Sequence, residues 1–164
     1  MTFITVRQGD EEQLKMLEGL MLDYVSETDD HQNIKTTKEI IPKITRSMID
    51  KLSEDRILEI VTEDGYPIGF FYAKIDRKTD RGLVRDGWGY IMEFYVAKAY
   101  RRREIGRQMV DLCEKFFKDR GAKDIWLTAD GVTGIPFWIS VGYTDSGELS
   151  PENGQKILVK ELNN

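Results

Sequence analysis

Residues 88–117, WGYIMEFYVAKAYRRREIGRQMVDLCEKFF, constrain the fold of this chain more than any other stretch. The first part, residues 88–97, is rich in aromatic and β-branched side chains and predicts a strand. From Ile105 onward the apolar residues recur with helical spacing, which predicts an amphipathic helix from about Gly106. Three consecutive arginines lie in the polar turn between the two segments. The stretch therefore predicts a strand, a basic turn and a helix.

The beginning of this helix has the chemistry of an anion site. The first backbone amides of a helix have no partner inside it, and the helix dipole adds partial positive charge there. Arg101, Arg102, Arg103 and Arg107 add full charges and forked donors that suit phosphate, and Gly106 permits a close approach. The turn thus predicts a pyrophosphate site, although the same residues also fit a solvated arginine run before an ordinary helix.

Composition places the chain among ordinary globular proteins. Its 164 residues, 40% hydrophobic and 32% charged, predict a single domain over residues 1–164. A net charge of −5 argues against a general nucleic-acid binder. A lone cysteine, Cys113, excludes an intrachain disulfide and, with no membrane-spanning apolar run or signal-peptide pattern, favours a cytoplasmic location. The lone His31 gives no metal-ligand spacing, so no metal is predicted.

Periodicity along the chain predicts the element order β-α-α-β-β-β-α-β-α-β-β. Strands at 56–62, 67–75 and 88–97, joined by hairpins, form an antiparallel meander. The helix between strands 88–97 and 124–129 requires these two strands to pair in parallel. The predicted fold class is α/β, with an α+β mixed sheet, and ligands favour the crevice where such parallel neighbours splay apart.

Local signals predict how several helices begin. Asp10, with Gln13 as its reciprocal partner, is expected to cap the first helix, and Thr133 to cap the last. A loop is predicted over residues 31–37, and a second helical region over about 37–52. Because Pro42 is tolerated only in a first turn, the regular part of that region is expected to begin near Ile41.

Tyr95-Val96 followed by residues 100–107, YRRREIGR, resembles the acetyl-CoA signature of the GNAT superfamily of N-acetyltransferases, Arg/Gln-x-x-Gly-x-Gly/Ala after a strand. Arg101 and Gly106 match its ends, whereas Glu104 stands where the family usually has its first glycine. That carboxylate would repel a pyrophosphate unless it swings away, pairs with an arginine or caps the helix. A second segment, FWISVGY at 137–143, is similar to the family's Phe-Tyr-x-x-x-Gly-Phe, and the element order is similar along almost the whole chain.

The resemblance implies a GNAT-like acyl-CoA N-acyltransferase fold, in which the meander changes to a parallel pair at a central splayed strand, with helices on both faces. It implies transfer of the acetyl group of acetyl-CoA to a primary amine of a small molecule, or to an amino group of a peptide or protein. It also implies the following cofactor-binding residues: Phe94, Tyr95, Val96, Arg101, Arg102, Arg103, Glu104, Ile105, Gly106, Arg107, Asp130, Phe137 and Trp138.

The chemistry needs a proton acceptor for the amine and, unless the thiolate leaves unassisted, a proton donor for it. Glu93 is the one carboxylate inside strand 88–97, so it is the candidate base or amine-binding group, although a structural ion pair or exposure at the strand end fits it equally well. Tyr90 and Tyr95 are the alternatives for lining the site or relaying a proton. Trp138 stands where many family members have a tyrosine, and an indole cannot protonate a thiolate at useful pH. Tyr143 is therefore the candidate acid, with bulk water or unassisted departure as the alternatives.

Two rival functions remain at this point. A non-catalytic acyl-CoA-binding or regulatory domain on the same fold is favoured by the departures at Glu104 and Trp138. A nucleic-acid module using the arginine run is argued against by the acidic total charge. We expect no nucleic-acid or membrane partner, and a homodimer is left open.

Overall fold

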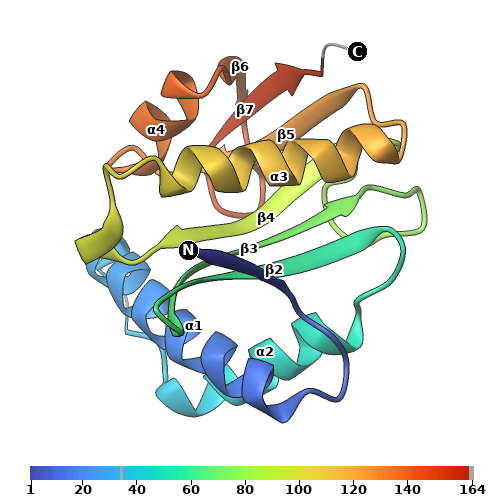
Figure 1. Ribbon diagram of the computed structural model, residues 1–164. Helices are drawn as coiled ribbons and strands as arrows, with labels where there is room; N and C mark the ends of the chain where they lie inside the picture. Colours follow the sequence, from blue (N-terminus) through green and yellow to red (C-terminus); the bar gives the residue numbers. More distant parts are fainter. Residues whose placement is uncertain (34, 163–164) are drawn as a thin grey trace. The chain divides into compact units, whose positions relative to one another are not determined.

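A computed structural model describes residues 1–33 and 35–162 (Figure 1). The chain forms two compact units. Unit 1 comprises Met1–Tyr72 and Glu93–Gly106, and unit 2 comprises Ala73–Met92 and Arg107–Asn164. The predicted single domain over residues 1–164 stays a prediction.

The strands form one mixed seven-stranded sheet in the order β1-β2-β3-β4-β5-β7-β6. Strands β3, Tyr66–Ile75, and β4, Gly89–Val96, each contribute residues to both units. Strand β4 pairs in parallel with β5, Asp124–Ala129, through Gly89↔Ile125 and Tyr90↔Trp126. The predicted element order and the predicted mixed sheet with its parallel pair are confirmed.

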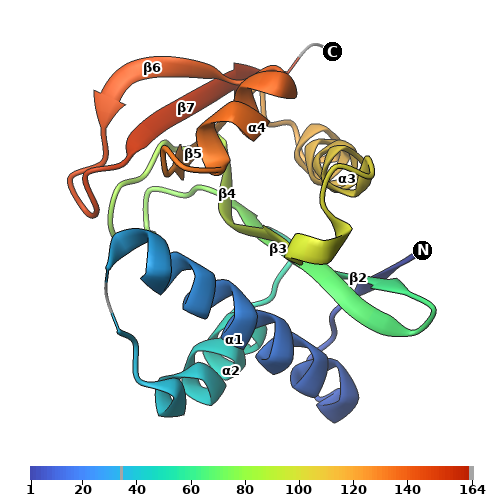
Figure 2. The ribbon, with the colours of Figure 1, turned by 90° about the vertical axis from the view of Figure 1, so that its left-hand side faces the viewer.

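Unit 1 places two helices beside an antiparallel strand pair. Strand β1, Thr2–Thr5, pairs with β2, Arg56–Glu63, and helices α1, Glu11–Gln32, and α2, Ile41–Asp50, lie side by side (Figure 2). The apolar side chains of the two helices are buried at Leu14, Leu17, Leu20, Met21, Ile41, Met48 and Ile49. The Asp64-Gly65 turn between β2 and β3 has φ values of 50° and 81°, the left-handed backbone that an Asp-Gly pair tolerates in a tight turn.

The helix starts of unit 1 differ in detail from the prediction. Asp10 caps α1 by accepting from the Gln13 amide, as expected, but the Gln13 side chain accepts from the Arg7 amide rather than closing a reciprocal box. Helix α1 continues to Gln32, past the predicted start of the loop, and residue 34 of that loop lies outside the described residues. A short 3-10 turn, Lys38–Ile40, precedes α2, whose regular part begins at Ile41 as predicted.

Unit 2 contains most of α3, Ile105–Asp119, and the C-terminal strands. Strand β7, Lys156–Glu161, lies antiparallel between β5 and β6, Thr144–Leu149, and the short helix α4, Gly134–Ser140, connects β5 to β6. The α3 stripe is buried at Met109, Val110, Cys113, Phe116 and Phe117, and burial raises the pKa of the Cys113 thiol well above its usual range. A Cβ at Gly89 would lie 2.7 Å from the Phe117 ring, which explains a glycine at the start of β4.

A buried polar network anchors the loop between β3 and β4. Asp76, fully buried, accepts from the Trp126 indole at 2.7 Å and from the Arg85 amide at 2.9 Å through one carboxylate oxygen. Lys74 lies 3.3 Å from the other oxygen and 3.0 Å from Asp80. The network fixes this loop from inside unit 2. In the described part of the chain, no helix combines the length and apolar character needed to cross a membrane.

Candidate active site

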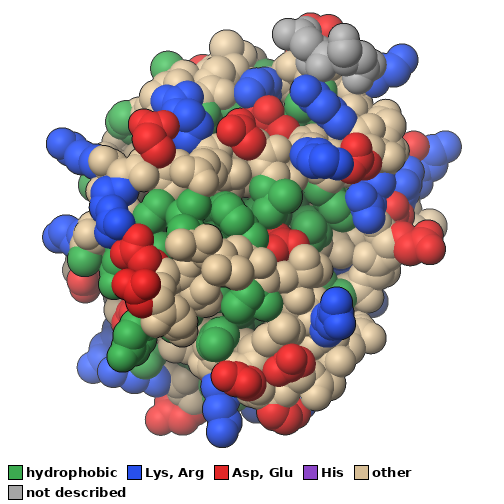
Figure 3. All heavy atoms as spheres, viewed as in Figure 1, with side chains coloured by type: hydrophobic (Ala, Val, Ile, Leu, Met, Phe, Trp, Pro, Cys, Tyr) green, Lys and Arg blue, Asp and Glu red, His purple; other side chains and the backbone are tan. Residues whose placement is uncertain are grey.

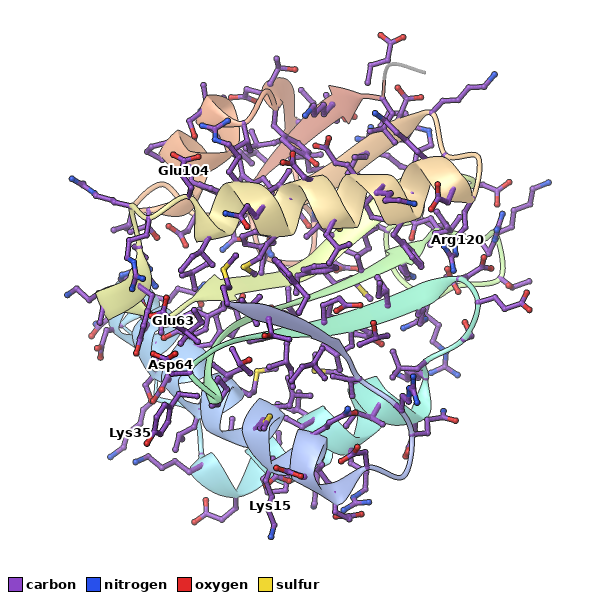
Figure 4. All side chains as sticks on the ribbon, viewed as in Figure 1. Lys15, Lys35, Glu63, Asp64, Glu104 and Arg120 are labelled. Carbon is purple, nitrogen blue, oxygen red and sulfur yellow. The ribbon has the colours of Figure 1, made fainter. Side chains whose placement is uncertain are left out.

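The basic turn of unit 1 connects β4 to α3 through a short 3-10 segment, Lys98–Tyr100. Two of its residues, Arg102 and Glu104, have positive φ values of 61° and 64°. Such a backbone is uncommon for residues other than glycine. It explains how Glu104 occupies a position that the GNAT signature usually gives to glycine: the chain adopts the glycine-like conformation there despite the side chain. Figure 4 shows Glu104 beside the beginning of α3.

The two arginines that alternate with these residues are held by carboxylates. Arg101 makes a two-pronged ion pair with Glu27 of α1, with both N–O distances 2.7 Å, and its Nε donates to the Val96 carbonyl at 2.8 Å. Arg103 makes a similar pair with Glu63 at the end of β2, at 3.2 and 2.7 Å. The Arg101 hydrogen bond is the main cause that lowers the pKa of Glu27. Two of the four arginines predicted to bind phosphate, Arg101 and Arg103, therefore already have carboxylate partners.

Glu93 of β4 is paired with a tyrosine of α1 in unit 1. Tyr24 of α1 hydrogen-bonds to its carboxylate, and the Tyr24 ring packs edge-on against Phe70 and Tyr95 at centroid distances of 5.9 and 5.4 Å. Burial raises the pKa of Glu93, and the hydrogen bond from Tyr24 opposes that shift. The carboxyl is thereby a better proton acceptor near neutral pH than an exposed glutamate.

The rest of the β4 segment assigned to the cofactor is also placed in unit 1. Phe94 stacks on Phe71 at 6.4 Å, and Tyr95 is buried beneath the Arg101 guanidinium, whose centre lies 5.7 Å from its ring. The Val96 carbonyl is already an acceptor for Arg101. The predicted backbone edge at Phe94–Val96 thus has one carbonyl already engaged by the basic turn.

Unit 2 contains the other assigned cofactor residues. The Asp130 carboxylate accepts from the amides of Val132 and Thr133 at 2.8 and 3.2 Å. The cap predicted for Thr133 is wrong, because its side chain makes no capping hydrogen bond, and the Ile135 amide donates instead to the Asp130 backbone carbonyl at 3.0 Å. Phe137 and Trp138 of α4 lie edge-to-face at 5.0 Å, and the Trp138 side chain is buried.

Tyr143, the predicted acid, is buried at the end of α4 with 1% of its surface exposed. Its hydroxyl donates to Glu114 of α3 at 3.3 Å, and Lys160 of β7 donates to the same carboxylate oxygen at 2.8 Å. Burial and the nearby Glu114 charge raise the pKa of Tyr143 far above its usual range. A phenol in this setting holds its proton tightly, so the geometry argues against its use as an acid.

The predicted site residues are thus divided between the units. Unit 1 contains Glu93, Phe94, Tyr95, Val96 and residues 101–106, while Arg107, Asp130, Phe137, Trp138 and Tyr143 belong to unit 2. The sequence did not assign Tyr24, Glu27 or Glu63 to the site. The acidic residues near the C-terminal end of the first helix were the sequence signal that could have pointed to Glu27. No local pattern indicated a role in the site for Tyr24 or Glu63.

Surface charge and the available metal ligands bear on two alternatives, a nucleic-acid-binding face and a metal site. On the face shown in Figure 3, acidic and basic side chains are interspersed, and no extended basic face accompanies the arginine turn there. Among residues 1–33 and 35–162, no cluster of three or more His, Cys, Asp or Glu side chains suits a metal ion.

Comparison with known proteins places the chain in a family. The model of the acetyltransferase (GNAT) family matches residues 20–143. An aminoglycoside 6'-acetyltransferase type Ii aligns at 19% identity with a TM-score of 0.75, covering 100% of this chain and 99% of that one. An N-acetyltransferase, paia, from Thermoplasma acidophilum in complex with coenzyme A aligns at 18% identity with a TM-score of 0.69, covering 99% and 100%.

A third solved structure, an aminoglycoside 6'-N-acetyltransferase complexed with coenzyme A, aligns at 15% identity with a TM-score of 0.73 over 100% of this chain and 98% of its own. A search among curated proteins found no match. At these low sequence identities, the TM-scores and the coverage establish a shared fold. The match to the family model covers more than half of the chain. The chain therefore belongs to the GNAT family of acetyl-CoA-dependent N-acetyltransferases.

Proposed function

We propose that this protein transfers the acetyl group of acetyl-CoA to a primary amine of a small molecule or to an amino group of a peptide or protein. One observation carries the proposal: the family signature lies on a loop with two left-handed residues, Arg102 and Glu104, directly before α3. Successive backbone amides in a turn conformation of this kind form a concavity that binds anions. A helix start beyond it adds to this attraction.

The residues around this loop fit a diphosphate ester. Ile105 and Gly106 supply the amides at the start of α3, and the exposed Arg102 and Arg107 supply charge. We assign the β4 backbone at Phe94 and Tyr95 to the pantetheine arm, and Asp130, Phe137 and Trp138 to further cofactor contacts. Acetyl-CoA supplies the acyl thioester.

Glu93 is proposed as the base. The neutral amine nitrogen attacks the thioester carbonyl carbon and forms a C–N bond. The nitrogen becomes positively charged on attack and passes a proton to the Glu93 carboxylate. The C–S bond then breaks and releases the thiolate of coenzyme A. Its raised pKa supports this role, because a carboxyl that titrates closer to neutrality is a stronger base. Tyr24 holds that carboxylate in place through its hydroxyl.

The departing thiolate is proposed to leave without a protein acid. A thiol with a pKa of about 8.5 is a tolerable leaving group and takes its proton from water. The burial of Tyr143 and its raised pKa favour this over the alternative in which Tyr143 donates the proton. Tyr143 is assigned instead to anchoring α4.

Acetyl-CoA binding and turnover test the proposal. The purified protein should show a thermal shift with acetyl-CoA, and Arg102→Ala combined with Arg107→Ala should reduce it because two charges near the pyrophosphate are lost. Free-thiol release should then appear with at least one member of an amine panel that includes aminoglycosides, diamines and peptide N-termini. Failure to bind millimolar acetyl-CoA would rule the proposal out.

The departures at Glu104 and Trp138 keep a non-catalytic acyl-CoA-binding domain as the second candidate. Binding of acetyl-CoA without thiol release on any amine would favour it. A cytoplasmic location, the lack of a nucleic-acid partner and a possible homodimer remain predictions, and size-exclusion chromatography with light scattering decides the last.

A further inference from the structure

The turn between β4 and α3 in unit 1 is held at alternate residues. Arg101 gives all three of its side-chain nitrogens to acceptors, two to Glu27 and one to the Val96 carbonyl. The Tyr95 ring lies beneath its guanidinium at 5.7 Å. The Arg101 side chain is 30% exposed and that of Glu27 is 24% exposed, so solvent screens this pair only in part.

A second pair repeats the arrangement two residues along the chain. Arg103 contacts both carboxylate oxygens of Glu63, and its guanidinium lies 5.5 Å from the Tyr100 ring. Glu63 ends β2 and lies at the turn that leads into β3, next to Asp64 (Figure 4). This pair is more exposed, with 48% of the Arg103 side chain open to solvent.

The residue that follows each paired arginine has a strained backbone. Arg102 and Glu104 each adopt a left-handed conformation, which is unfavourable for a residue with a Cβ atom. Conformations of this kind persist where the surroundings determine them. The two ion pairs fix the residue before each strained position, and they bind the turn to α1 and to the β2–β3 corner.

We propose that Glu27 and Glu63 are positioning residues for acetyl-CoA binding. They hold Arg101 and Arg103 so that the turn keeps its left-handed residues and presents its amides to the pyrophosphate, and they act through the backbone without touching the cofactor. The inference rests on the proposed function and changes one part of it. Arg101 and Arg103 are removed from the phosphate contacts, and Arg102 and Arg107 keep that role.

The sign of one affinity change separates this proposal from its alternative. If Arg101 left Glu27 to contact the pyrophosphate, the carboxylate would compete with the cofactor, and Glu27→Gln would tighten acetyl-CoA binding. If the pair positions the turn, Glu27→Gln weakens binding. We expect Glu27→Gln to lower the affinity for acetyl-CoA about tenfold, because the left-handed conformation of Arg102 is then no longer held by the ion pair before it. For Glu63→Gln we expect a smaller loss of about threefold, because its ion pair is more exposed to solvent.

Isothermal titration with acetyl-CoA at fixed ionic strength measures these changes. The double variant Glu27→Gln/Arg101→Gln should weaken binding no more than Arg101→Gln alone, since Glu27 acts through Arg101. Asp119→Asn is the matched control, because it removes one member of an exposed ion pair with Lys115 on α3. That control should leave affinity unchanged. Unchanged or tighter binding in Glu27→Gln would overturn the proposal.

A measurement without ligand keeps this inference distinct from the proposed function. Amide hydrogen exchange over residues 101–106 in the ligand-free protein should be faster in Glu27→Gln than in the wild type and unchanged in Asp119→Asn. If the wild type does not bind acetyl-CoA, the proposed function fails, and exchange still reports whether the carboxylates hold the turn. Unchanged exchange in Glu27→Gln, or faster exchange with unchanged affinity, would contradict the positioning role.

Discussion

Two tyrosine–carboxylate pairs, one in each unit, differ in which member has its pKa raised. In unit 1, Tyr24 donates to Glu93, and burial raises the pKa of the carboxyl group. In unit 2, Tyr143 donates to Glu114, which also accepts from Lys160, and it is the pKa of the phenol that is strongly raised. In the first pair, burial is the main influence on the pKa of the carboxyl group, whereas in the second pair the Glu114 carboxylate forms an ion pair with Lys160. The same two groups therefore suit proton transfer in one place and anchoring in the other.

The largest expected effect is on the chemical step. Glu93→Gln keeps the shape of the side chain but removes the proton acceptor, and we expect kcat/KM to fall by about 100-fold or more. Free-thiol release with the best amine of the panel measures it. Acetyl-CoA affinity, measured by titration, is the control and should stay within about twofold. A loss of less than about threefold in kcat/KM would remove Glu93 from the base role.

The unit 2 pair should respond in stability instead. Glu114→Gln removes a charge that accepts from both Lys160 and Tyr143, and we expect the free energy of unfolding to fall by about 2 kcal/mol. Urea denaturation followed by fluorescence measures the change. The surface variant Asp119→Asn on the same helix should lie within about 0.5 kcal/mol of the wild type. Equal stability of Glu114→Gln and wild type would show that this pair anchors nothing.

Glu93→Gln should change stability in the opposite direction, by a smaller amount. A raised carboxyl pKa means that the folded state binds more protons than the unfolded state between the two pKa values, so stability falls as pH rises through that window. Glutamine avoids this loss. We expect the variant to be more stable at pH 7 by about 1 kcal/mol, with the gain disappearing below the ordinary pKa of glutamate. Denaturation at pH 4 and pH 7 checks both statements.

Tyr24→Phe should give the smallest effect, a shift in a pH profile. The Tyr24 hydroxyl stabilises the charged form of Glu93, so its removal raises the pKa of the carboxyl further. The lower limb of kcat/KM against pH should then move upward by less than about one pH unit. Movement in the downward direction would contradict the assigned hydrogen bond.

Local and periodic signals predicted the fold well. Aromatic and β-branched runs gave the strands, and the spacing of Met109, Cys113, Phe116 and Phe117 gave the long helix, because these patterns reflect burial on one face. The Asp64-Gly65 turn was predictable because its residues tolerate positive φ. Caps were harder: Thr133 has the right chemistry, but its side chain makes no capping hydrogen bond, and the Ile135 amide donates to the Asp130 backbone carbonyl.

The site was less predictable because its partners are distant in sequence. Arg101 and Glu27 are 74 residues apart, and Arg103 and Glu63 are 40 apart, so no local pattern connects them. The two arginines by themselves predict phosphate binding. Their carboxylate partners, seen only in the structure, indicate instead that they fix the conformation of the turn between β4 and α3. Likewise Tyr143 has the right chemistry for an acid, and only its burial against Glu114 shows why its proton is held.

The pH dependence of kcat/KM for wild type, Glu93→Gln and Tyr143→Phe, measured under one set of conditions, tests most directly whether Glu93 rather than Tyr143 transfers a proton. The contrast between the pairs predicts a lower limb in the wild type with an apparent pKa above that of an ordinary glutamate, the same limb in Tyr143→Phe, and its loss in Glu93→Gln. A limb that persists in Glu93→Gln, or a rate that collapses in Tyr143→Phe while its fold is intact, would contradict the account.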